Sequence, residues 1–124
     1  MNRLKTIIAT LLDSLALSGP SLADTPGRLM DGDAFFTMVE GRELALPFFR
    51  VSLKLDKSGG IDGTAMGWPL TGQWRWEDGL FCRSIDWSGT EIPANCQLVE
   101  LVGNDRLRFT SDAGQGMSAV FVVR

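Results

Sequence analysis

Hydrophobic and polar residues alternate along much of the chain after residue 48, and this pattern predicts strands. Between Phe49 and Leu55, apolar side chains occupy every second position, and Arg50, Ser52 and Lys54 lie between them. A period of two residues places the two sets on opposite faces of a half-buried strand. Turn residues follow at 56–60, and further apolar runs predict strands at residues 61–66, 97–102, 106–110 and 117–123.

One helix is predicted before the strands, from about Ala34 to Glu43. Its apolar side chains recur three and four residues apart, at Phe35, Met38 and Val39. Asp31 or Asp33 can cap the first turn, and Gly41 is a stop signal near the end. Pro47 then returns the chain to an extended conformation, and a break is expected at Gly67-Trp68-Pro69.

The strongest turn signal is Asp78-Gly79, because these residues suit the left-handed backbone angles of a two-residue type I′ turn. The turn predicts a hairpin within the run from Gly72 to Arg83. Its register places Glu77 opposite Leu80, Trp76 opposite Phe81, Arg75 opposite Cys82, and Trp74 opposite Arg83.

This register puts two side-chain pairs on one face of the hairpin. Trp76 and Phe81 are expected to stack, and Trp74 with Arg83 could form a cation–π contact. Cys82 points to the other face. About seven strands joined by short turns, with no helix long enough for a parallel crossover, predict a mainly β fold. We expect a short N-terminal helix and an antiparallel meander that is curled or closed into a small barrel.

Cys82 and Cys96 are the two cysteines of the chain, and they predict one disulfide. Cys96 must then approach Cys82 from the opposite face or from the next strand. A redox or metal pair is the alternative. The spacing is far from Cys-x-x-Cys, and the chain has no histidine to complete a zinc set. We therefore expect a structural disulfide and no metal site.

The first residues have the pattern of a signal peptide. Arg3 and Lys5 precede an apolar stretch from Ile7 to Leu17, and Ser21-Leu22-Ala23 places small residues before Asp24. We expect cleavage after Ala23, so that residues 1–23 are a leader and residues 24–124 form a single β-rich domain. An amphipathic first helix is the alternative. The apolar stretch is too short to span a bilayer, so we expect a periplasmic or secreted protein without a membrane span.

Charge and composition narrow the function. The chain has 12 basic and 15 acidic residues, and the leader takes more basic than acidic ones. Scattered positive charge on an acidic domain argues against nucleic acid as a partner. Without histidine or tyrosine, the usual nucleophile systems and a phenolic acid or base are excluded. We therefore expect no catalytic residue. Because neither Gly-x-Gly-x-x-Gly nor a Walker loop occurs, we also expect no cofactor.

Two weaker acidic motifs do not change this picture. The run from Asp56 to Asp62 superficially resembles a calcium loop, but Ile61 occupies the position that requires glycine. Glu77 and Asp78 are adjacent carboxylates, yet neighbouring strand residues point to opposite faces and Asp78 belongs to the turn. We expect a plain turn and no acid–base pair.

The tryptophans can line a sugar or lipid site, or they can fill the core. We expect Trp74 and Trp76 in the core and Trp68, between glycine and proline, as an exposed ring. A role in binding stays open for Trp74. The candidate ligand- or partner-binding residues are Trp68, Trp74, Arg83 and Trp87.

The order of these elements resembles that of a group of small exported bacterial proteins of unknown function. The matching positions cover most of the chain after the leader: Gly41 to Leu44, Gly72 to Trp74, Asp78-Gly79, Cys82 and Cys96. Some members are labelled dihydrodipicolinate reductase. That enzyme is cytoplasmic, longer and nicotinamide-dependent, and this chain lacks its glycine fingerprint and histidines, so we regard the label as wrong. Because the shared motifs are structural, the resemblance implies a fold and no specific activity.

Three classes of function stay open. The favoured one is a non-catalytic binding or interaction module, expected to be a monomer, whose partner is an envelope protein. The alternative is a carrier of a small apolar or aromatic ligand, with Trp68, Phe81 and Trp87 as its walls. An enzyme that uses only Asp, Glu, Ser and Arg is the least favoured. A carrier requires an internal cavity of at least about 300 Å³, whereas a protein-binding module requires an exposed apolar patch.

Overall fold

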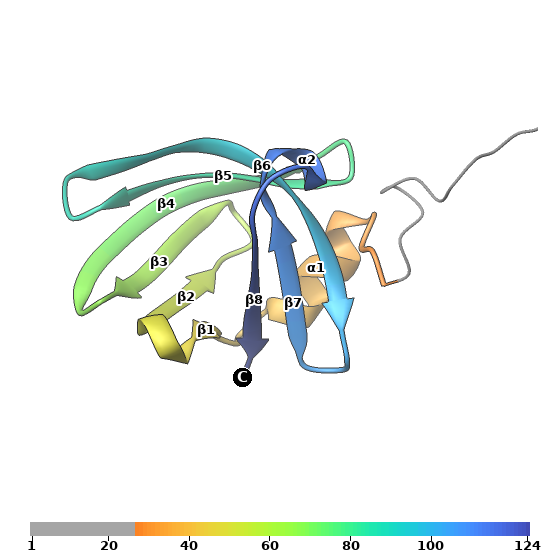
Figure 1. Cartoon of the computed structure of the whole chain (residues 1–124), viewed down its shortest axis with the longest axis horizontal. Helices are drawn as coiled ribbons and strands as arrows, with labels where there is room; N and C mark the ends of the chain where they lie inside the picture. Colours follow the sequence, from red (N-terminus) through yellow and green to blue (C-terminus); the bar gives the residue numbers. More distant parts are fainter. Residues whose placement is uncertain (1–26) are drawn as a thin grey trace, which may run out of the picture.

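The computed structural model describes residues 27–124, which form a closed antiparallel barrel of eight strands (Figure 1). Each strand pairs with the next in the chain, and β8 pairs with β1 to close the ring. The elements are α1 (Gly32–Val39), β1 (Leu44–Leu46), the 3₁₀ helix η2 (Pro47–Phe49), β2 (Val51–Leu55), β3 (Gly60–Ala65), β4 (Trp68–Glu77), β5 (Leu80–Trp87), β6 (Thr90–Val102), β7 (Arg106–Thr110), α2 (Ser111–Gly114) and β8 (Ser118–Val123). The predicted small barrel is confirmed, and the predicted leader lies outside the described residues.

The strand β1 was not predicted, because three residues are too few to show a period. It lies between α1 and η2 and pairs with β2 on one side and β8 on the other. The helix α1 is shorter than predicted and begins two residues earlier, with Asp31 as its cap. It ends at Val39 because Glu40 is extended and Gly41 is left-handed, with φ 71°. This early end lets the chain enter the barrel at Leu44.

Two further predictions near the turns were wrong. Phe49 belongs to η2, so β2 begins only at Val51. The break expected at Gly67-Trp68-Pro69 lies one residue earlier, because Met66 and Gly67 form the turn with φ of 55° and 87°. Trp68 and Pro69 are the first residues of β4. A proline is tolerated there because the start of a strand can omit one ladder hydrogen bond.

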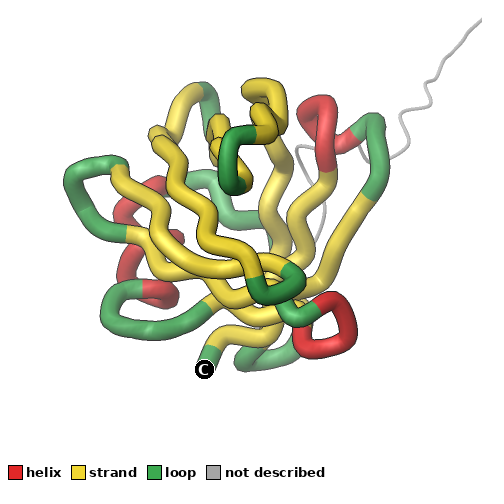
Figure 2. Tube along the Cα trace, turned by 90° about the vertical axis from the view of Figure 1, so that its left-hand side faces the viewer, coloured by secondary structure: helices red, strands yellow, loops and turns green. Residues whose placement is uncertain are grey.

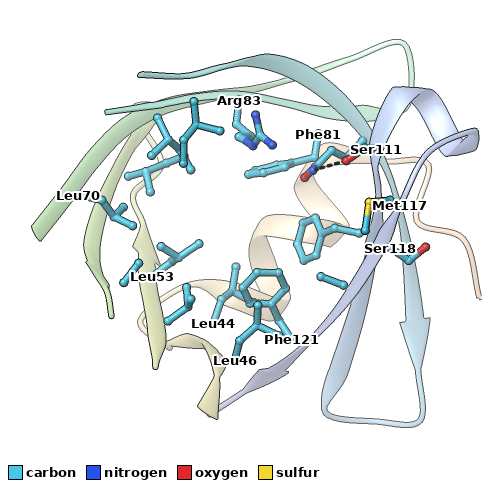
Figure 3. Close-up of a pocket in the computed structure, with 18 residues that line it drawn as sticks. Leu44, Leu46, Leu53, Leu70, Phe81, Arg83, Ser111, Met117, Ser118 and Phe121 are labelled. Carbon is cyan, nitrogen blue, oxygen red and sulfur yellow. Dashed lines mark hydrogen bonds between the residues drawn. The ribbon is translucent and has the colours of Figure 1, made fainter. Parts of the chain in front are cut away.

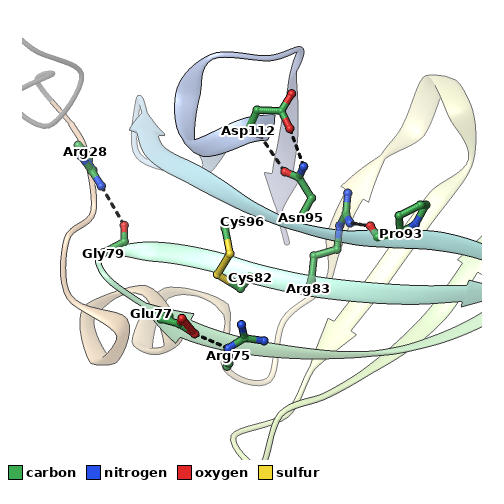
Figure 4. Close-up of a disulfide and its surroundings, with 10 residues drawn as sticks. All are labelled: Arg28, Arg75, Glu77, Gly79, Cys82, Arg83, Pro93, Asn95, Cys96 and Asp112. Carbon is green, nitrogen blue, oxygen red and sulfur yellow. Dashed lines mark hydrogen bonds and ion pairs between the residues drawn. A yellow bond between two sulfur atoms is a disulfide. The ribbon is translucent and has the colours of Figure 1, made fainter.

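The predicted Asp78-Gly79 hairpin is confirmed with its register. Both turn residues are left-handed, with φ of 54° and 74°, as a type I′ turn requires. The disulfide joins Cys82 of β5 to Cys96, which faces it directly on the next strand, β6 (Figure 4). Of the two approaches that the sequence allowed, the chain uses the neighbouring strand.

The helix α1 covers one end of the barrel, where it places Phe35 among the aromatic side chains of the strands. Phe35 is fully buried, and its ring stacks on Trp76 with centroids 5.0 Å apart. Trp76 faces Phe81 across the hairpin, as predicted, but the ring of Phe81 stacks on Trp74 at 5.8 Å. A residue from outside the hairpin therefore changes the stacking that the register alone suggested.

The end of the barrel opposite α1 carries four of the seven connections between consecutive strands. In an antiparallel meander consecutive turns lie at alternate ends, so η2 and the turns at 66–67, 88–89 and 111–117 lie at the end opposite α1. Figure 2 shows the strands in yellow and the loops and turns that join them in green. The α1 end instead has the turns at 56–59, 78–79 and 103–105. Among residues 27–124, no helix has the length and apolar character that crossing a bilayer requires.

Glu43 and Arg124 join the two ends of the barrel sheet. Their backbones exchange hydrogen bonds of 2.7 and 3.0 Å, and Arg124 Nε donates to Glu43 Oε1 at 2.7 Å. Ser52 Oγ of β2 donates to Glu43 Oε2 at 2.6 Å. The hydrogen bonds from Ser52 and Arg124 hold the pKa of Glu43 below its ordinary value of 4.5.

Removing the disulfide is expected to destabilise the fold. Replacing Cys82 and Cys96 together by alanine frees a loop of 14 residues in the unfolded chain and should lower the free energy of unfolding by about 3 kcal/mol. Urea denaturation of the purified domain measures this, with the reduced wild type as a second case. Equal midpoints for the oxidised protein and the variant would contradict the prediction.

The Glu43 interactions make part of the stability dependent on pH. A carboxyl whose pKa is lower in the folded state stabilises the fold above its unfolded pKa, and this contribution disappears as the pH falls through the folded pKa. Urea midpoints of the wild type and Glu43→Gln should therefore differ at pH 7 and converge below pH 4.5. A difference that stays constant down to pH 3 would show that the negative charge of Glu43 does not contribute to stability.

Candidate functional site

The barrel encloses a cavity of about 400 Å³ (Figure 3). Eighteen described residues line it, and fourteen of them are apolar. Three others are neutral and polar, namely Gln97, Ser111 and Ser118. Among the lining residues only Arg83 carries a charge. The site is therefore an apolar chamber with one cation in its wall.

The floor of the cavity is aromatic. Phe81 and Phe109 line it, and their ring centroids are 5.3 Å apart. Phe35 of α1 contacts both rings from the helix side, at 5.3 and 6.1 Å. Large rings thus fill the α1 end of the barrel and separate the cavity from the helix.

The mouth lies at the opposite end, beside η2 and the turn at 66–67. Leu46, Val51 and Ala65 line the cavity and flank these connections directly. Most large apolar side chains that are exposed also lie at this end, and we call them the rim: Phe48, Phe49, Met66, Trp68 and Met117. Phe48 is 89% exposed and Met117 is 84% exposed, and Met117 also lines the cavity.

Arg83 points into the barrel because of its place on β5. Phe81, Arg83 and Ile85 occupy alternate positions of this strand and all line the cavity. Opposite them, β6 contains a bulge: Arg83 pairs with Asn95, but Ile85 pairs with Ile92. One extra residue of β6 therefore lies opposite Ser84.

The extra residue comes from Pro93-Ala94, and proline has no N–H for the ladder. The Pro93 carbonyl accepts a hydrogen bond of 2.9 Å from Arg83 Nη1 (Figure 4). The bulge thus supplies the acceptor that orients the guanidinium. Bulges of this kind re-aim side chains next to functional sites.

The charge of Arg83 has no counter-ion in the described part of the chain. The ion pairs there are Arg75–Glu77, Arg108–Glu100 and Arg124–Glu43. Partial burial of the guanidinium lowers the pKa of Arg83, because the charged form loses hydration. Gln97 Nε2 donates to Ser111 Oγ at 3.4 Å, and Gln97 lies on β6, the strand that pairs with the strand of Arg83.

The segment around α2 folds over β6 at the mouth end. Asp112 and Ala113 are both left-handed, with φ of 55°. The side chain of Asn95 holds Asp112 by two hydrogen bonds: its Nδ2 donates to Asp112 Oδ1 at 2.8 Å, and its Oδ1 accepts from Asp112 N at 2.9 Å. This arrangement brings Ser111 and Met117 to the wall of the cavity.

The four predicted binding residues are not gathered in one place. Arg83 lines the cavity, and Trp68 is 63% exposed at the rim. The indole of Trp74 packs on Phe36 and Phe81 and donates to the Asp56 carbonyl. Trp87 packs against the core and donates to the Ala65 carbonyl. Of the walls expected for a carrier, Phe81 lines the cavity, whereas Trp68 and Trp87 are not among its lining residues.

Sequence reasoning missed the larger apolar part of the wall. Residues of β1, β2, β7 and β8 supply much of it, among them Leu44, Leu53, Phe109 and Phe121. Their alternation marks the inward face of each strand, but it does not show whether the opposing side chains meet. The alternation of apolar residues thus identifies the inward-facing side chains, but the cavity depends on the distance between opposing strands of the barrel.

The acidic motifs have local partners. Asp56 Oδ1 accepts hydrogen bonds from Ser58 and Gly60 within its own turn, and these lower the pKa of Asp56. Arg75 Nε donates to Glu77 at 2.6 Å. Among residues 27–124, no three Cys, Asp or Glu side chains gather as ligands for a metal ion.

Comparison with protein-family models, with curated proteins and with solved structures found no match to this chain. The interpretation of the cavity therefore rests on its own geometry.

The aromatic floor predicts a large effect of Phe35→Ala. Truncating a fully buried phenylalanine leaves a void, which should lower the free energy of unfolding by about 3–5 kcal/mol. Phe48→Ala is the matched control, since it removes an exposed ring and should change stability by less than about 0.5 kcal/mol. Chemical denaturation compares the two variants, and equal effects would contradict this account of the floor.

Proposed function

We propose that this protein is a non-catalytic carrier that holds a small apolar ligand inside its barrel. The observation that carries the proposal is the cavity of about 400 Å³ with fourteen apolar lining residues. Ligand sites in proteins are mostly apolar chambers of about 300–1,000 Å³ with a few placed polar groups. An eight-stranded barrel is wide enough to hold one small ligand when its side chains do not fill it.

The distribution of side-chain size supports this use of the interior. Aromatic rings gather at the α1 end, where Phe35, Trp76, Phe81 and Phe109 pack together. The lining of the mouth half is mostly aliphatic, and Met117 and Phe121 are its largest side chains. The barrel is thus packed at one end and open at the other, which suits storage and release better than catalysis.

The lining also argues against an enzyme. One guanidinium, one amide and two hydroxyl groups supply its polarity, and no carboxylate or thiol among the described residues lines the cavity. A general acid–base pair needs two groups that exchange a proton near the operating pH. The guanidinium does not lose its proton in that range.

Binding by apolar burial alone would be weak. Each methylene group that leaves water contributes about 0.8 kcal/mol, so a chain of ten contributes about 8 kcal/mol. Association costs an estimated 4–15 kcal/mol in lost freedom. A polar anchor in addition to the apolar wall would therefore strengthen the binding of a ligand of this size.

A second candidate is a module that binds another protein of the cell envelope. The observation that favours it is the rim, where the exposed Phe48, Phe49, Met66 and Trp68 lie on neighbouring turns; Met66 N and Arg50 O of these turns share a hydrogen bond. Both candidates suit a periplasmic or secreted protein, for which the disulfide and the signal-peptide pattern argue.

The carrier proposal predicts binding of the neutral fluorescent probe N-phenyl-1-naphthylamine, with a rise in emission when the probe enters the cavity. Ala119→Phe should reduce this binding at least about tenfold, which is ~1.4 kcal/mol, because the added ring fills the cavity from β8. Val120→Phe adds the same ring one position along the strand, where Val120 is exposed, and should bind as the wild type does.

Equal loss or equal retention of binding in the two variants would contradict the interior site. If the wild type does not bind the probe, the carrier proposal fails and the rim becomes the favoured site. Native mass spectrometry of the protein purified from its own source then decides between the candidates. A retained small mass supports the carrier, and a co-purifying protein supports the module.

A further inference from the structure

We propose that the ligand is an amphiphile with a carboxylate head group, which pairs with Arg83 while its apolar chain lies along the leucine-lined wall. This inference rests on the proposed carrier function and specifies the chemistry of its ligand. Three observations support it: the Arg83 guanidinium has no counter-ion among the described residues, its Nε and Nη2 have no hydrogen-bond partner there, and the polar lining residues Arg83, Gln97 and Ser111 lie on neighbouring elements.

An unpaired cation that is half-buried in the wall of an apolar cavity destabilises the folded protein. Charged groups that leave water lose hydration, and proteins recover this loss by pairing them. The ion pairs among residues 27–124 do not include Arg83, and partial burial of its guanidinium disfavours the charged form. An anion delivered with the ligand would supply the missing partner.

The geometry of Arg83 leaves room for such an anion. Its Nη1 donates to the Pro93 carbonyl at 2.9 Å, and the guanidinium makes no other hydrogen bond within residues 27–124. The edge formed by Nε and Nη2 is therefore available. Two parallel N–H donors on a planar fork match the two oxygens of a carboxylate, which is the strongest arrangement for such a pair.

The Pro93 contact also keeps the guanidinium in place. A long arginine side chain near a cavity mouth can extend outward to water. Here the bulge at Pro93-Ala94 offers a carbonyl to Arg83, and the Cys82–Cys96 disulfide joins the two strands at the adjacent pair. The binding group is thus held before the ligand arrives, which lowers the entropy cost of recognition.

The two sides of the cavity differ in polarity (Figure 3). Arg83, Gln97 and Ser111 lie on the side of β5, β6 and α2. The opposite wall has leucines from β1, β2 and β4, which in Figure 3 are Leu44, Leu46, Leu53 and Leu70. A wholly apolar ligand would leave the cation unpaired, and a wholly polar one would leave the leucine wall unfilled.

The test compares two ligands that differ only in the head group. Decanoate and decanol are titrated at pH 7.5 against protein loaded with N-phenyl-1-naphthylamine, and displacement of the probe gives each affinity. We expect the wild type to prefer decanoate at least about tenfold, which corresponds to ~1.4 kcal/mol. In Arg83→Met the preference should disappear while the neutral probe still binds.

Arg75→Met is the matched control. It removes the same charge from the neighbouring strand β4, where the Arg75 side chain is 66% exposed and paired with Glu77, so the preference for decanoate should persist. If circular dichroism shows that Arg83→Met does not fold, Arg83→Gln replaces it. The glutamine keeps a polar N–H donor at this position and removes the charge.

The outcomes separate this inference from the carrier proposal. Probe binding with equal displacement by decanoate and decanol would overturn the carboxylate inference and leave the carrier proposal standing. A preference that survives in Arg83→Met or Arg83→Gln would place the anion site elsewhere and also overturn it. Failure of the wild type to bind the probe or either ligand would overturn the carrier proposal itself.

Discussion

The packing of Phe35 into one end of the barrel determines much of what the rest of the molecule can do. An eight-stranded barrel has an interior that side chains can just fill, and here one helix supplies a ring that concentrates the aromatic packing at its own end. Phe35 contacts Trp74, Trp76, Phe81 and Phe109. With the core completed there, the strands do not have to meet across the other half, and a cavity is left at the mouth.

One residue of the cavity wall departs from the rule that inward-facing side chains are apolar. Arg83 follows the inward face of β5, where its neighbours on that face, Phe81 and Ile85, are apolar. The chain accommodates the guanidinium by a bulge on β6 whose Pro93 carbonyl accepts one hydrogen bond. Sites that break a local rule and are supported by neighbouring structure are where function is expected. The disulfide lies at the adjacent pair and stabilises the same two strands.

The rim and the cavity belong to the same end of the barrel, so the two candidate functions are physically related. A ligand that enters the cavity would have to pass the exposed aromatic and methionine side chains at the mouth. Large exposed apolar patches on small soluble domains mark sites of interaction. A carrier that exchanges its ligand with another surface would need both features.

Local physics made several parts of this protein predictable from its sequence. The Asp78-Gly79 turn and its register followed from backbone angles, and the strands followed from a period of two. The two cysteines in a chain with a signal-peptide pattern predicted their pairing. Each of these predictions depends on residues that are close in sequence or, for the disulfide, on the number of cysteines in the chain. The three-residue β1 lay below the length at which a period can be detected. Gly41 was recognised as a stop signal, but α1 ends two residues before it, at Val39.

What the tertiary structure decided was how distant faces meet. The alternation at Leu53, Arg83 and Phe121 shows that each side chain leaves one face of its strand, but whether opposing faces touch depends on ring closure and on how deeply Phe35 enters. The stacking partner of Trp76 changed for the same reason. Local conformation is a property of neighbouring residues, whereas a cavity is the space that eight strands and a helix leave between them, and no segment of the sequence contains it.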